Sequence, residues 1–429
     1  MAVANNTFLA DLLAGRPVAD RGDPLGRLRA RAVERVGTLT TPNTRDEDWR
    51  FTDISPLTRV SYQPSRAAAT VSAADLALFV LPDAATRLVF IDGHYAPQLS
   101  TPQTGAVVVS SLAAALPAQA ALVEAELGRM AAFENNAFTA LNTAFVNDGA
   151  LVVLPRGAAP QSPIHLLFVA TQKDVAAYPR CLVVAAAGSK ATVIEDYVAL
   201  TGDAYLTNAV GEFSLADDAQ LHHVRVQREG VNAFHIGHTA VSVAHGARYH
   251  GVSIGFGARL SRYNLEVVQA AEGAECEIGG LAMIAGTQLA DTHTTIDHAK
   301  PHGVSRQQHK CIVGGSARAV FNGRIVVRPG AQLTNSAQSS RNLLLSDRAR
   351  VDTKPQLEIF ADDVKCAHGA TVGQLEADEV FYLKSRGLSD AAARSLLTYA
   401  FGAEILRGIP VASLRQRLEQ AVLAQTESA

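Results

Sequence analysis

The chain has 429 residues and a formal net charge of −3; 48% of its residues are hydrophobic but only 6% are aromatic. This near-neutral balance gives no reason to expect nucleic acid or an anionic membrane surface as a partner. The length allows two or three domains or one elongated domain. An apolar fraction built mainly from Ala, Val and Leu suits a narrow, repetitive, tightly stacked core.

No targeting or membrane segment is predicted. Asn5, Asn6 and Asp11 interrupt any apolar run at the N-terminus, so we expect no signal peptide. No stretch of about 20 uncharged apolar residues is present, so we expect no membrane span. Neither a P-loop nor a G-x-G-x-x-G turn occurs, so a partner would have to supply any nucleotide energy. Four cysteines without a CxxC pair indicate reduced thiols in a cytoplasmic protein: Cys181, Cys276, Cys311 and Cys366.

Residues 1–148 are expected to form a largely helical N-terminal region. Asp23-Pro24 places a capping carboxylate before a proline at the first helical position, which predicts a helix start. A further helical region is expected from about Ala118 to Asn147, and the polar segment NTRDEDWRFTD before it carries the only tryptophan, Trp49. Apolar residues at helical spacing support this interpretation: Phe8, Leu9, Leu12 and Leu13; Leu25, Leu28, Ala32 and Val36; Phe138, Leu141 and Phe145.

From Gly149 the composition changes to β-rich runs such as LVVLP, HLLFVA and CLVVAAA, separated by Gly, Pro and Asp. A turn-like token, a small or acidic pair followed by Ala or Val, recurs through most of this region. The token ends at Ala191, Ala219, Ala247, Ala274, Ala317, Ala331, Ala349 and Val364. The first three intervals between these residues are nearly equal, and the last three are little more than half as long. Such recurrence is typical of stacked coils, each made of a few short strands.

We therefore predict a mainly β fold, in which residues 149–375 form a β-helix or a related β-solenoid. A two-sheet sandwich is the competing interpretation, because sandwiches also space their strands by about 8–12 residues. Residues 376–429 are expected to be helical, with a stop at Gly387, a capping Ser389, and a break at Gly408 and Pro410. These helices are either a cap for the end of the solenoid or a docking platform for another subunit.

Cys366 and His368 stand two residues apart in the run VDTKPQLEIFADDVKCAHGATVG, and such residues share one face of a strand. A thiolate beside an imidazole is half of a soft-metal site, because a closed site usually takes four ligands. The same spacing also allows a structural pair, with a small buried cysteine and a histidine hydrogen-bonded to a turn. The position just before the terminal helices favours the metal interpretation, since another chain could add ligands at that edge.

A second group of candidate ligands is concentrated in the run DTHTTIDHAKPHGVSRQQHKC: His293, His298, His302, His309 and Cys311. Turns separate most of these residues, so buried or stacked histidines are a more common outcome than a metal site. A nucleophilic Cys–His pair would also need an orienting group and an oxyanion site, and nothing nearby suggests one.

Charged residues also line the late strands: Arg324, Arg328, Arg341, Arg348, Arg350, Asp352 and Lys354. Some β-helix proteins are polysaccharide lyases that use such residues, so a carbohydrate lyase or hydrolase is the first alternative function. A sugar groove should be rich in aromatics, however, and the late coils hold only Phe321 and Phe360. The other interpretation is a solvated face with cross-strand ion pairs.

Two stretches resemble the SufD family of iron–sulfur cluster assembly scaffolds. They are Trp49-Arg50-Phe51-Thr52-Asp53 behind Glu47-Asp48, and the run from GRIVVRPGAQLTNSAQSSRNLLL through DTKPQLEIFADDVKCAHGATVG to FYLKSRG. The resemblance is almost without gaps from about Phe321 to Glu404 and weaker over the first third. It implies a right-handed parallel β-helix flanked by helical N- and C-terminal regions, and a non-catalytic scaffold in the cytoplasm.

The resemblance also implies partners and a site. Members pair with the sister subunit SufB through the ends of their β-helices, and a nascent iron–sulfur cluster forms between the two chains. This chain would contribute His368 and the adjacent Cys366, and no cofactor would stay bound. The chain is unlike SufB because Ser339 and Ser340 stand where a cluster-building cysteine would be. Each member also binds the ATPase SufC through its C-terminal helices, with these candidate contacts: Phe381, Tyr382, Leu383, Arg386, Leu397, Tyr399, Phe401 and Glu404.

A mechanism follows as a hypothesis. ATP binding and hydrolysis dimerise two SufC subunits, which pull on the terminal helices, open the interface and expose Cys366 and His368 to iron and sulfide. Thiolate and imidazole are suitable iron ligands. In a second alternative function, the chain only holds SufB in place, and both side chains are buried and inert. Without SufB, a homodimer through the same edge is compatible with the sequence, and the involvement of a flavin stays open.

Overall fold

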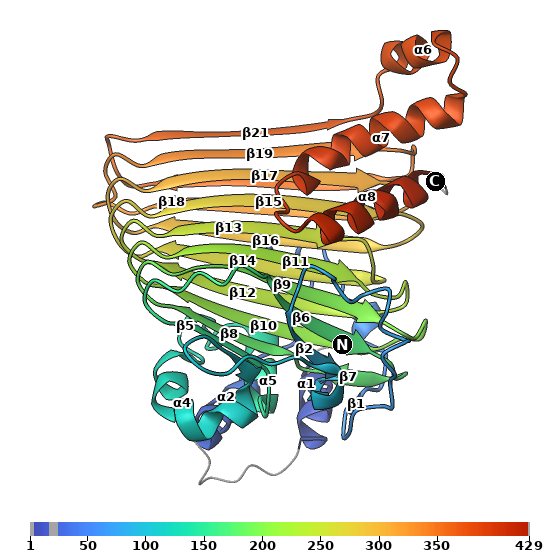
Figure 1. Ribbon diagram of the computed structural model, residues 1–429. Helices are drawn as coiled ribbons and strands as arrows, with labels where there is room; N and C mark the ends of the chain where they lie inside the picture. The colour runs from blue at the N-terminus through green and yellow to red at the C-terminus, as the bar shows by residue number, and fades with distance from the viewer. Residues whose placement is uncertain (1–3, 17–24, 428–429) are drawn as a thin grey trace.

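Two long, mostly parallel β-sheets face each other in the computed structural model, which describes residues 4–16 and 25–427 (Figure 1). The solenoid strands alternate between the sheets along the chain, so that neighbours within a sheet belong to successive coils. Over the described residues this arrangement makes about eight turns of a β-solenoid with helical regions at both ends. The predicted fold class is therefore confirmed, and the sandwich alternative is wrong.

We call the two sheets A and B. Sheet A contains, in spatial order, β20 (Arg350–Ile359), β18 (Arg318–Val327), β16 (Leu289–His298), β14 (Leu260–Gln269), β12 (Phe234–Val243), β10 (Leu206–Leu215), β8 (Arg180–Ala185), β5 (Ala150–Leu154) and β4 (Val108–Ser111), with β1 (Gln63–Pro64) and β7 (Val175–Ala177) at its margin. Sheet B contains β21 (Lys365–Gly373), β19 (Asn335–Leu344), β17 (Val304–Val313), β15 (Glu275–Ile284), β13 (Arg248–Gly255), β11 (Gln220–Arg228), β9 (Lys190–Ala199), β6 (Ile164–Ala170), β2 (Thr86–Ile91) and β3 (His94–Tyr95).

The described helices lie at the two ends of the chain. They are α1 (Ala4–Ala14), α2 (Gly26–Val36), η1 (Glu47–Trp49), α3 (Ser55–Thr58), η2 (Pro97–Leu99), α4 (Leu112–Glu126), α5 (Ala137–Phe145), α6 (Ala377–Ser385), α7 (Asp390–Leu406) and α8 (Ala412–Glu427). Within residues 4–16 and 25–427, none is long and apolar enough to span a membrane.

The repeated sequence token is a turn between the sheets. Gly246 and Asp218 adopt φ angles of +61° and +58° in equivalent turns, a left-handed backbone that Gly takes freely and Asp tolerates. The alanine after each of them, Ala247 or Ala219, is fully buried where the coil closes. The long intervals between tokens are whole coils, and the shorter intervals are roughly half coils. Each late coil therefore has two long strands, not the few short strands that we expected, since β15 and β16 have ten residues each.

The N-terminal region covers the first coils. Helices α1, α2 and α5 bury apolar residues such as Phe8 and Leu141 against Phe234 and Leu260 on the outer face of sheet A. This region also supplies strands, because β2 pairs with β6 and β4 with β5. The helix expected from Ala118 to Asn147 is instead two helices, α4 and α5, and the Asn136 side chain caps the second. The helix start expected at Asp23-Pro24 lies outside the described residues.

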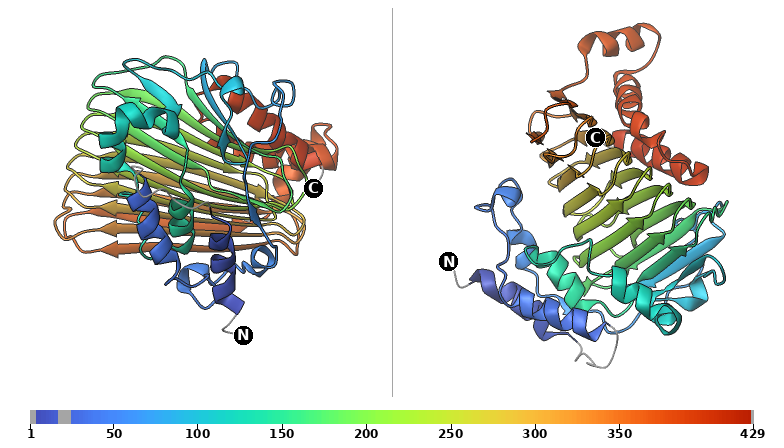
Figure 2. Two further views of the ribbon diagram at one scale, coloured as in Figure 1. Left: turned by 90° about the horizontal axis from the view of Figure 1, so that it is seen from below. Right: turned by 90° about the vertical axis from the view of Figure 1, so that its left-hand side faces the viewer.

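Helices α7 and α8 lie along the outer face of sheet B, and α6 projects beyond β21 (Figures 1 and 2). Ile405 and Leu414 pack there against Ile194 and Ile254. As expected, Ser389 caps α7 by accepting a hydrogen bond from the Ala392 backbone. The helices do not cover the end of the solenoid, so the capping interpretation is wrong. In the described part of the chain, nothing pairs with the outer edges of β20 and β21.

Candidate functional site

The predicted ligand pair lies on β21, the last strand of sheet B, at the free end of the solenoid (Figure 1). Cys366 is in register with Ser336 of β19, and His368 with Gln338. Ser336 and Gln338 are 2% and 3% exposed because they point between the two sheets. Cys366 and His368 are oriented toward the same space, but no further coil covers them. Consequently Cys366 is only half-buried and His368 is exposed.

Cys366 is the accessible thiol of this protein. All four cysteines are free, and the other three are buried. Burial raises the pKa of Cys276 and of Cys311 to about 12, which makes both poor nucleophiles and poor ligands. Partial burial also raises the pKa of Cys366, although a hydrogen bond from the Ser336 backbone opposes this. A thiol of this kind gives up its proton when it binds a metal ion.

The pair does not form a closed metal site within one chain. Over the described ranges, no group of three or more His, Cys, Asp or Glu side chains is arranged to hold a metal ion. Cys366 and His368 would leave a tetrahedral ion two ligands short. Any further ligands for such an ion must therefore come from another molecule.

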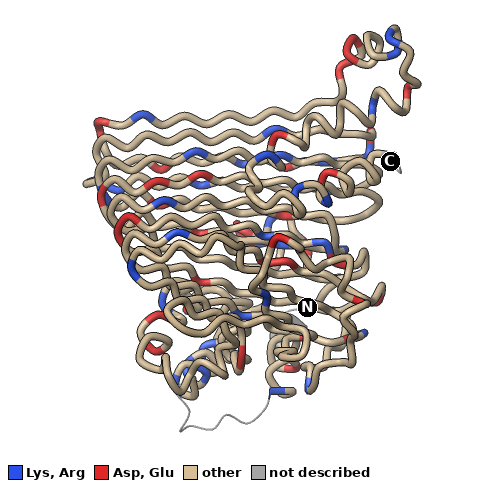
Figure 3. Tube along the Cα trace, in the orientation of Figure 1, with Lys and Arg blue, Asp and Glu red and all other residues tan. Residues whose placement is uncertain are grey.

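The free end of the solenoid has the features of a contact surface. Strand β21 carries one charged residue, Lys365, at its start (Figure 3). Apolar side chains are exposed around the same end: Leu333 by 49%, Phe360 by 62% and Val372 by 48%. Most monomeric proteins protect a free edge with charges, prolines or a covering element. Apart from Lys365, such protection is absent on β21, which favours pairing with another chain, whereas β20 carries Pro355 and four charged side chains.

The structure separates the second group of candidate ligands, which were His293, His298, His302, His309 and Cys311. His309 stacks on Phe321 inside the solenoid, with ring centroids 4.4 Å apart. His298 and Cys311 are also buried inside. His293 pairs with Asp291 at 3.1 Å on the outer face of sheet A, and His302 pairs with Glu272 at 3.5 Å. These histidines are therefore stacked or paired individually.

Charged side chains of the late strands form ion pairs across sheet A. Arg328 Nη2 lies 2.5 Å from Asp297 Oδ2, and Arg318 Nε lies 2.7 Å from Asp352 Oδ2. Arg324 Nη1 lies farther from its partner, at 3.8 Å from Glu358 Oε1. These contacts support the interpretation as a solvated face with cross-strand ion pairs.

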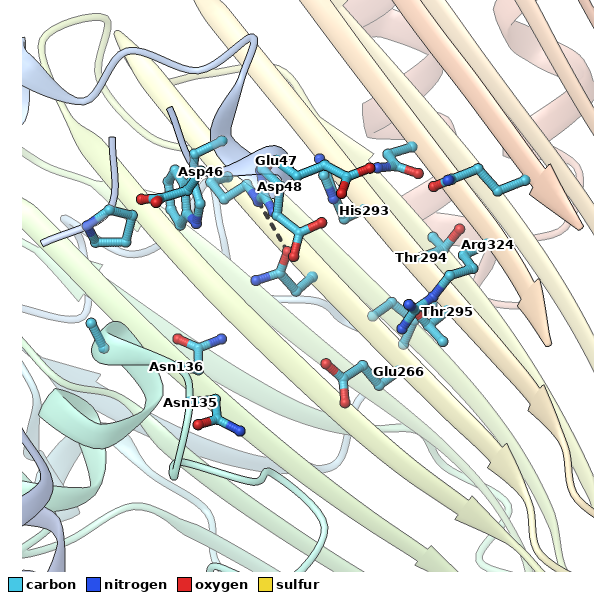
Figure 4. A pocket seen from close by; sticks show the side chains of 18 of the residues that line it. Asp46, Glu47, Asp48, Asn135, Asn136, Glu266, His293, Thr294, Thr295 and Arg324 are labelled. Carbon is cyan, nitrogen blue, oxygen red and sulfur yellow. Dashed lines mark hydrogen bonds between the residues drawn. The ribbon is translucent and has the colours of Figure 1, made fainter. Parts of the chain in front are cut away.

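A polar groove of about 580 Å³ lies between the outer face of sheet A and the segment around η1 (Figure 4). Arg262 anchors this segment, because its guanidinium donates to Asp291 at 2.5 Å and to the Asp48 carbonyl at 2.7 Å, and lies 4.5 Å from the Trp49 ring. Thr52 also donates to Asp291, at 2.5 Å. Although burial disfavours the ionised form of Asp291, Arg262 holds its pKa down to about 2.

Sequence reasoning missed this anchor, since the motif from Glu47 to Asp53 and its partners on sheet A are far apart in the chain. The only available signal was a single tryptophan, Trp49, in a polar segment. The groove is lined by residues from several elements, which Figure 4 labels: Asp46, Glu47, Asp48, Asn135, Asn136, Glu266, His293, Thr294, Thr295 and Arg324.

The residues predicted to contact an ATPase lie on α6 and α7, or at the end of α6. Phe381 and Tyr382 of α6 are 72% and 55% exposed, and α6 stands clear of the solenoid (Figure 2). Phe401 and Glu404 of α7 instead face sheet B. Lys310 donates to the Phe401 carbonyl at 2.8 Å and to the Glu404 carboxylate at 2.5 Å.

A two-sheet β-solenoid with helical regions at both ends is the architecture of this chain. The chain belongs to the SufB/SufD family of the SUF system for iron–sulfur cluster assembly. The family model described as the SufBD core domain matches residues 168–401, and the model of the SufBD N-terminal region matches residues 19–166.

Relatives extend over nearly the whole chain. An iron–sulfur cluster assembly SufBD family protein of Synechocystis is 42% identical over 412 residues, which cover 93% of this chain and 90% of the relative. The iron–sulfur cluster assembly protein SufD of Escherichia coli is 32% identical over 381 residues, covering 88% and 87%. The chloroplastic protein ABCI7 of Arabidopsis thaliana is 30% identical over 429 residues, covering 95% and 87%. The resemblance to SufD predicted from the sequence is thus confirmed.

Proposed function

We propose that this chain is a non-catalytic scaffold subunit of a Suf complex. It pairs with SufB through the free end of its solenoid, binds SufC through α6 and α7, and contributes Cys366 and His368 to a nascent cluster. The observation that carries the proposal is that half-buried Cys366 and exposed His368 lie on an edge strand that no element of the described residues covers. The four free cysteines suit the reducing cytoplasm.

Pairing through β20 and β21 would continue both sheets into the partner. The backbone groups on the outer edges of these strands would gain hydrogen-bond partners, and exposed apolar side chains such as Phe360 and Val372 would be covered. The same edge could also pair two copies of this chain when SufB is absent, with a two-fold symmetric contact.

The chemistry of the pair suits transient cluster binding. A thiolate and an imidazole both bind iron, and the remaining ligands would come from SufB. A site divided between two chains with mixed ligands should release its cluster more readily than a site of four thiolates in one chain. No cofactor is expected to remain bound to this subunit alone.

The C-terminal helices connect the proposed ATPase contact with the solenoid. Phe381 and Tyr382 on α6 are available to a partner, whereas Glu404 on α7 is bound to Lys310 of sheet B. A groove of about 1220 Å³ between α6, α7, α8 and the end of β19 adds contact surface. Movement of two SufC subunits toward each other would therefore pull on sheet B near β21 and could open the interface around Cys366.

The test is His368→Ala in the co-purified complex with SufB and SufC. We expect the complex to assemble normally and the yield of reconstituted cluster, measured by its visible absorption per complex, to fall by at least about tenfold. His302→Ala is the matched control, because His302 is an exposed histidine that pairs with Glu272 in a turn. Normal cluster yield from the His368 variant would leave this chain as a purely structural partner of SufB.

A further inference from the structure

A continuous column of hydrogen bonds runs through the solenoid interior toward Cys366. His298 Nε2 lies 3.0 Å from Ser305 Oγ, and Ser305 Oγ lies 2.6 Å from Ser336 Oγ. Ser336 is then in register with Cys366 on the next strand. His298 and Ser305 are fully buried and Ser336 is 2% exposed. The hydrogen bonds therefore run from a buried imidazole to Ser336, the neighbour in register with the half-buried thiol at the free end.

The direction of these hydrogen bonds follows from the ring of His298. Burial lowers its pKa to about 4, so at neutral pH the ring is uncharged and carries one N–H. Nδ1 of His298 is buried without a hydrogen-bond partner in the part of the chain that is described. An N–H buried without an acceptor is rarer than an unfilled acceptor, so we assign the ring proton to Nε2.

With this assignment His298 donates to Ser305, and we assign the Ser305 hydroxyl hydrogen to Ser336, because Ser336 is the other hydrogen-bond partner of the Ser305 hydroxyl among the described residues. The Ser336 hydroxyl hydrogen then remains available, since Ser305 is its one hydrogen-bond partner among the described residues. The next group along the ladder is Cys366, which is in register with Ser336. Each hydroxyl in the column thus points its hydrogen toward the free end.

We propose that Ser336, oriented by Ser305 and His298, is a positioning residue for Cys366 and donates its hydroxyl hydrogen bond to the sulfur when the sulfur binds metal. This inference rests on the proposed function, because it takes Cys366 to be a ligand. Hydrogen bonds to a ligating sulfur fix its orientation and stabilise its charged form. In this proposal His298 orients Ser336 through Ser305, whereas the sequence suggested no role for His298.

The test uses the full chain with Co²⁺ as the probe, because Co²⁺ bound to a thiolate gives a sulfur-to-cobalt charge-transfer band. We expect Ser336→Ala to weaken Co²⁺ binding by about tenfold and to shift this band. Ser336→Thr keeps the hydroxyl and should restore both affinity and band position. Ser339→Ala is the matched control, since Ser339 is on the same strand with its side chain on the opposite face, and it should behave as the unmodified protein.

Each outcome decides a separate point. Ser336→Ala binding Co²⁺ within about twofold of the unmodified chain, with the band unshifted, would overturn the role of Ser336 and leave Cys366 as a ligand. A weakened Ser336→Ala variant that Ser336→Thr does not rescue would show that the column only packs the strand, and would also overturn the inference. If the sulfur-to-cobalt band persists in Cys366→Ala, Cys366 is not the ligand, and the proposed metal site is then wrong.

Discussion

Single residues inside the solenoid form polar networks that the hydrophobic composition does not suggest. The His223 ring contacts Glu195 at 3.0 Å and the Tyr249 hydroxyl at 2.8 Å. Glu229 accepts from Thr207 at 2.6 Å. Burial disfavours the ionised form of these carboxyls, but neighbouring histidines hold the pKa of Glu195 and of Glu229 below the usual range. Such satisfied networks favour one register of the coils, because a shifted register would leave charges unpaired.

His309 provides a pH test at this scale. Burial lowers its pKa to about 3, whereas an unfolded histidine titrates near 6.5. Between these values the unfolded chain binds a proton that the folded chain does not. This contribution to stability is therefore complete above about pH 6.5 and is lost as the pH falls. We expect His309→Gln to reduce the loss of unfolding free energy between pH 7 and pH 5 by about 2 kcal/mol in urea titrations.

The control for this prediction is Ser339→Ala, which removes no titratable group and should show the same pH dependence as the unmodified chain. If unfolding free energy falls equally between pH 7 and pH 5 in the His309 variant and the unmodified chain, His309 takes up a proton in the folded state as it does in the unfolded state, and the prediction is wrong.

At the scale of elements, the attachment of α7 to sheet B combines apolar packing with one buried charge. Lys310 is 2% exposed, and its ammonium donates to Glu404 and to the Phe401 carbonyl and lies 4.4 Å from the Phe401 ring. Ile405 and Leu406 pack beside this contact. The C-terminal half of α7 is therefore fixed to the sheet, while its N-terminal half leads to the projecting α6.

Glu404→Ala tests this attachment. The substitution leaves the Lys310 ammonium with only the Phe401 carbonyl and the ring, so we expect a loss of about 1–3 kcal/mol of unfolding free energy. Backbone amides of α7 and of β17 should exchange faster with deuterium. Glu358→Ala removes an exposed partner of Arg324 and should change stability by less than about 0.5 kcal/mol. Unchanged exchange in α7 would show that apolar packing alone holds the helix.

For the whole molecule, the two ends of the solenoid differ. The N-terminal helices cover the first coils, whereas the last coil presents two free strands and exposed apolar side chains (Figure 2). A solenoid with an uncovered end is prone to associate, because terminal coils normally need a polar cap. Exposed apolar surface is therefore left at the end formed by β20 and β21.

Phe360→Glu tests the use of this end. A carboxylate at a buried contact cannot be desolvated without cost, so co-purification with SufB should drop and the affinity should weaken by at least about tenfold, or about 1.4 kcal/mol. Leu78→Glu is the control, since Leu78 is 79% exposed but lies in a loop near α8. Equal SufB binding by both variants would place the interface elsewhere.

The solenoid was predictable from the sequence because its turns are local. A left-handed Gly or Asp followed by a buried alanine, as at Gly246 and Asp218, recurs along the coils. The regular spacing of this token reports the coil length without any knowledge of the packing. The same is true of the helix signals at Gly387 and Ser389. These local patterns predict the fold, whereas the prediction of function came mainly from the family resemblance.

What the sequence determined by itself was the repeating core, the terminal helices and the placement of Cys366 and His368 on one face of a strand. Tertiary structure decided where α7 and α8 lie, that Glu404 binds Lys310, and that Arg262 anchors the segment around Trp49. It also decided that His298 leads through Ser305 to Ser336 beneath Cys366. Turn chemistry acts between neighbours in the chain, whereas these contacts join residues whose closeness depends on how the coils stack and which apolar surface each helix buries.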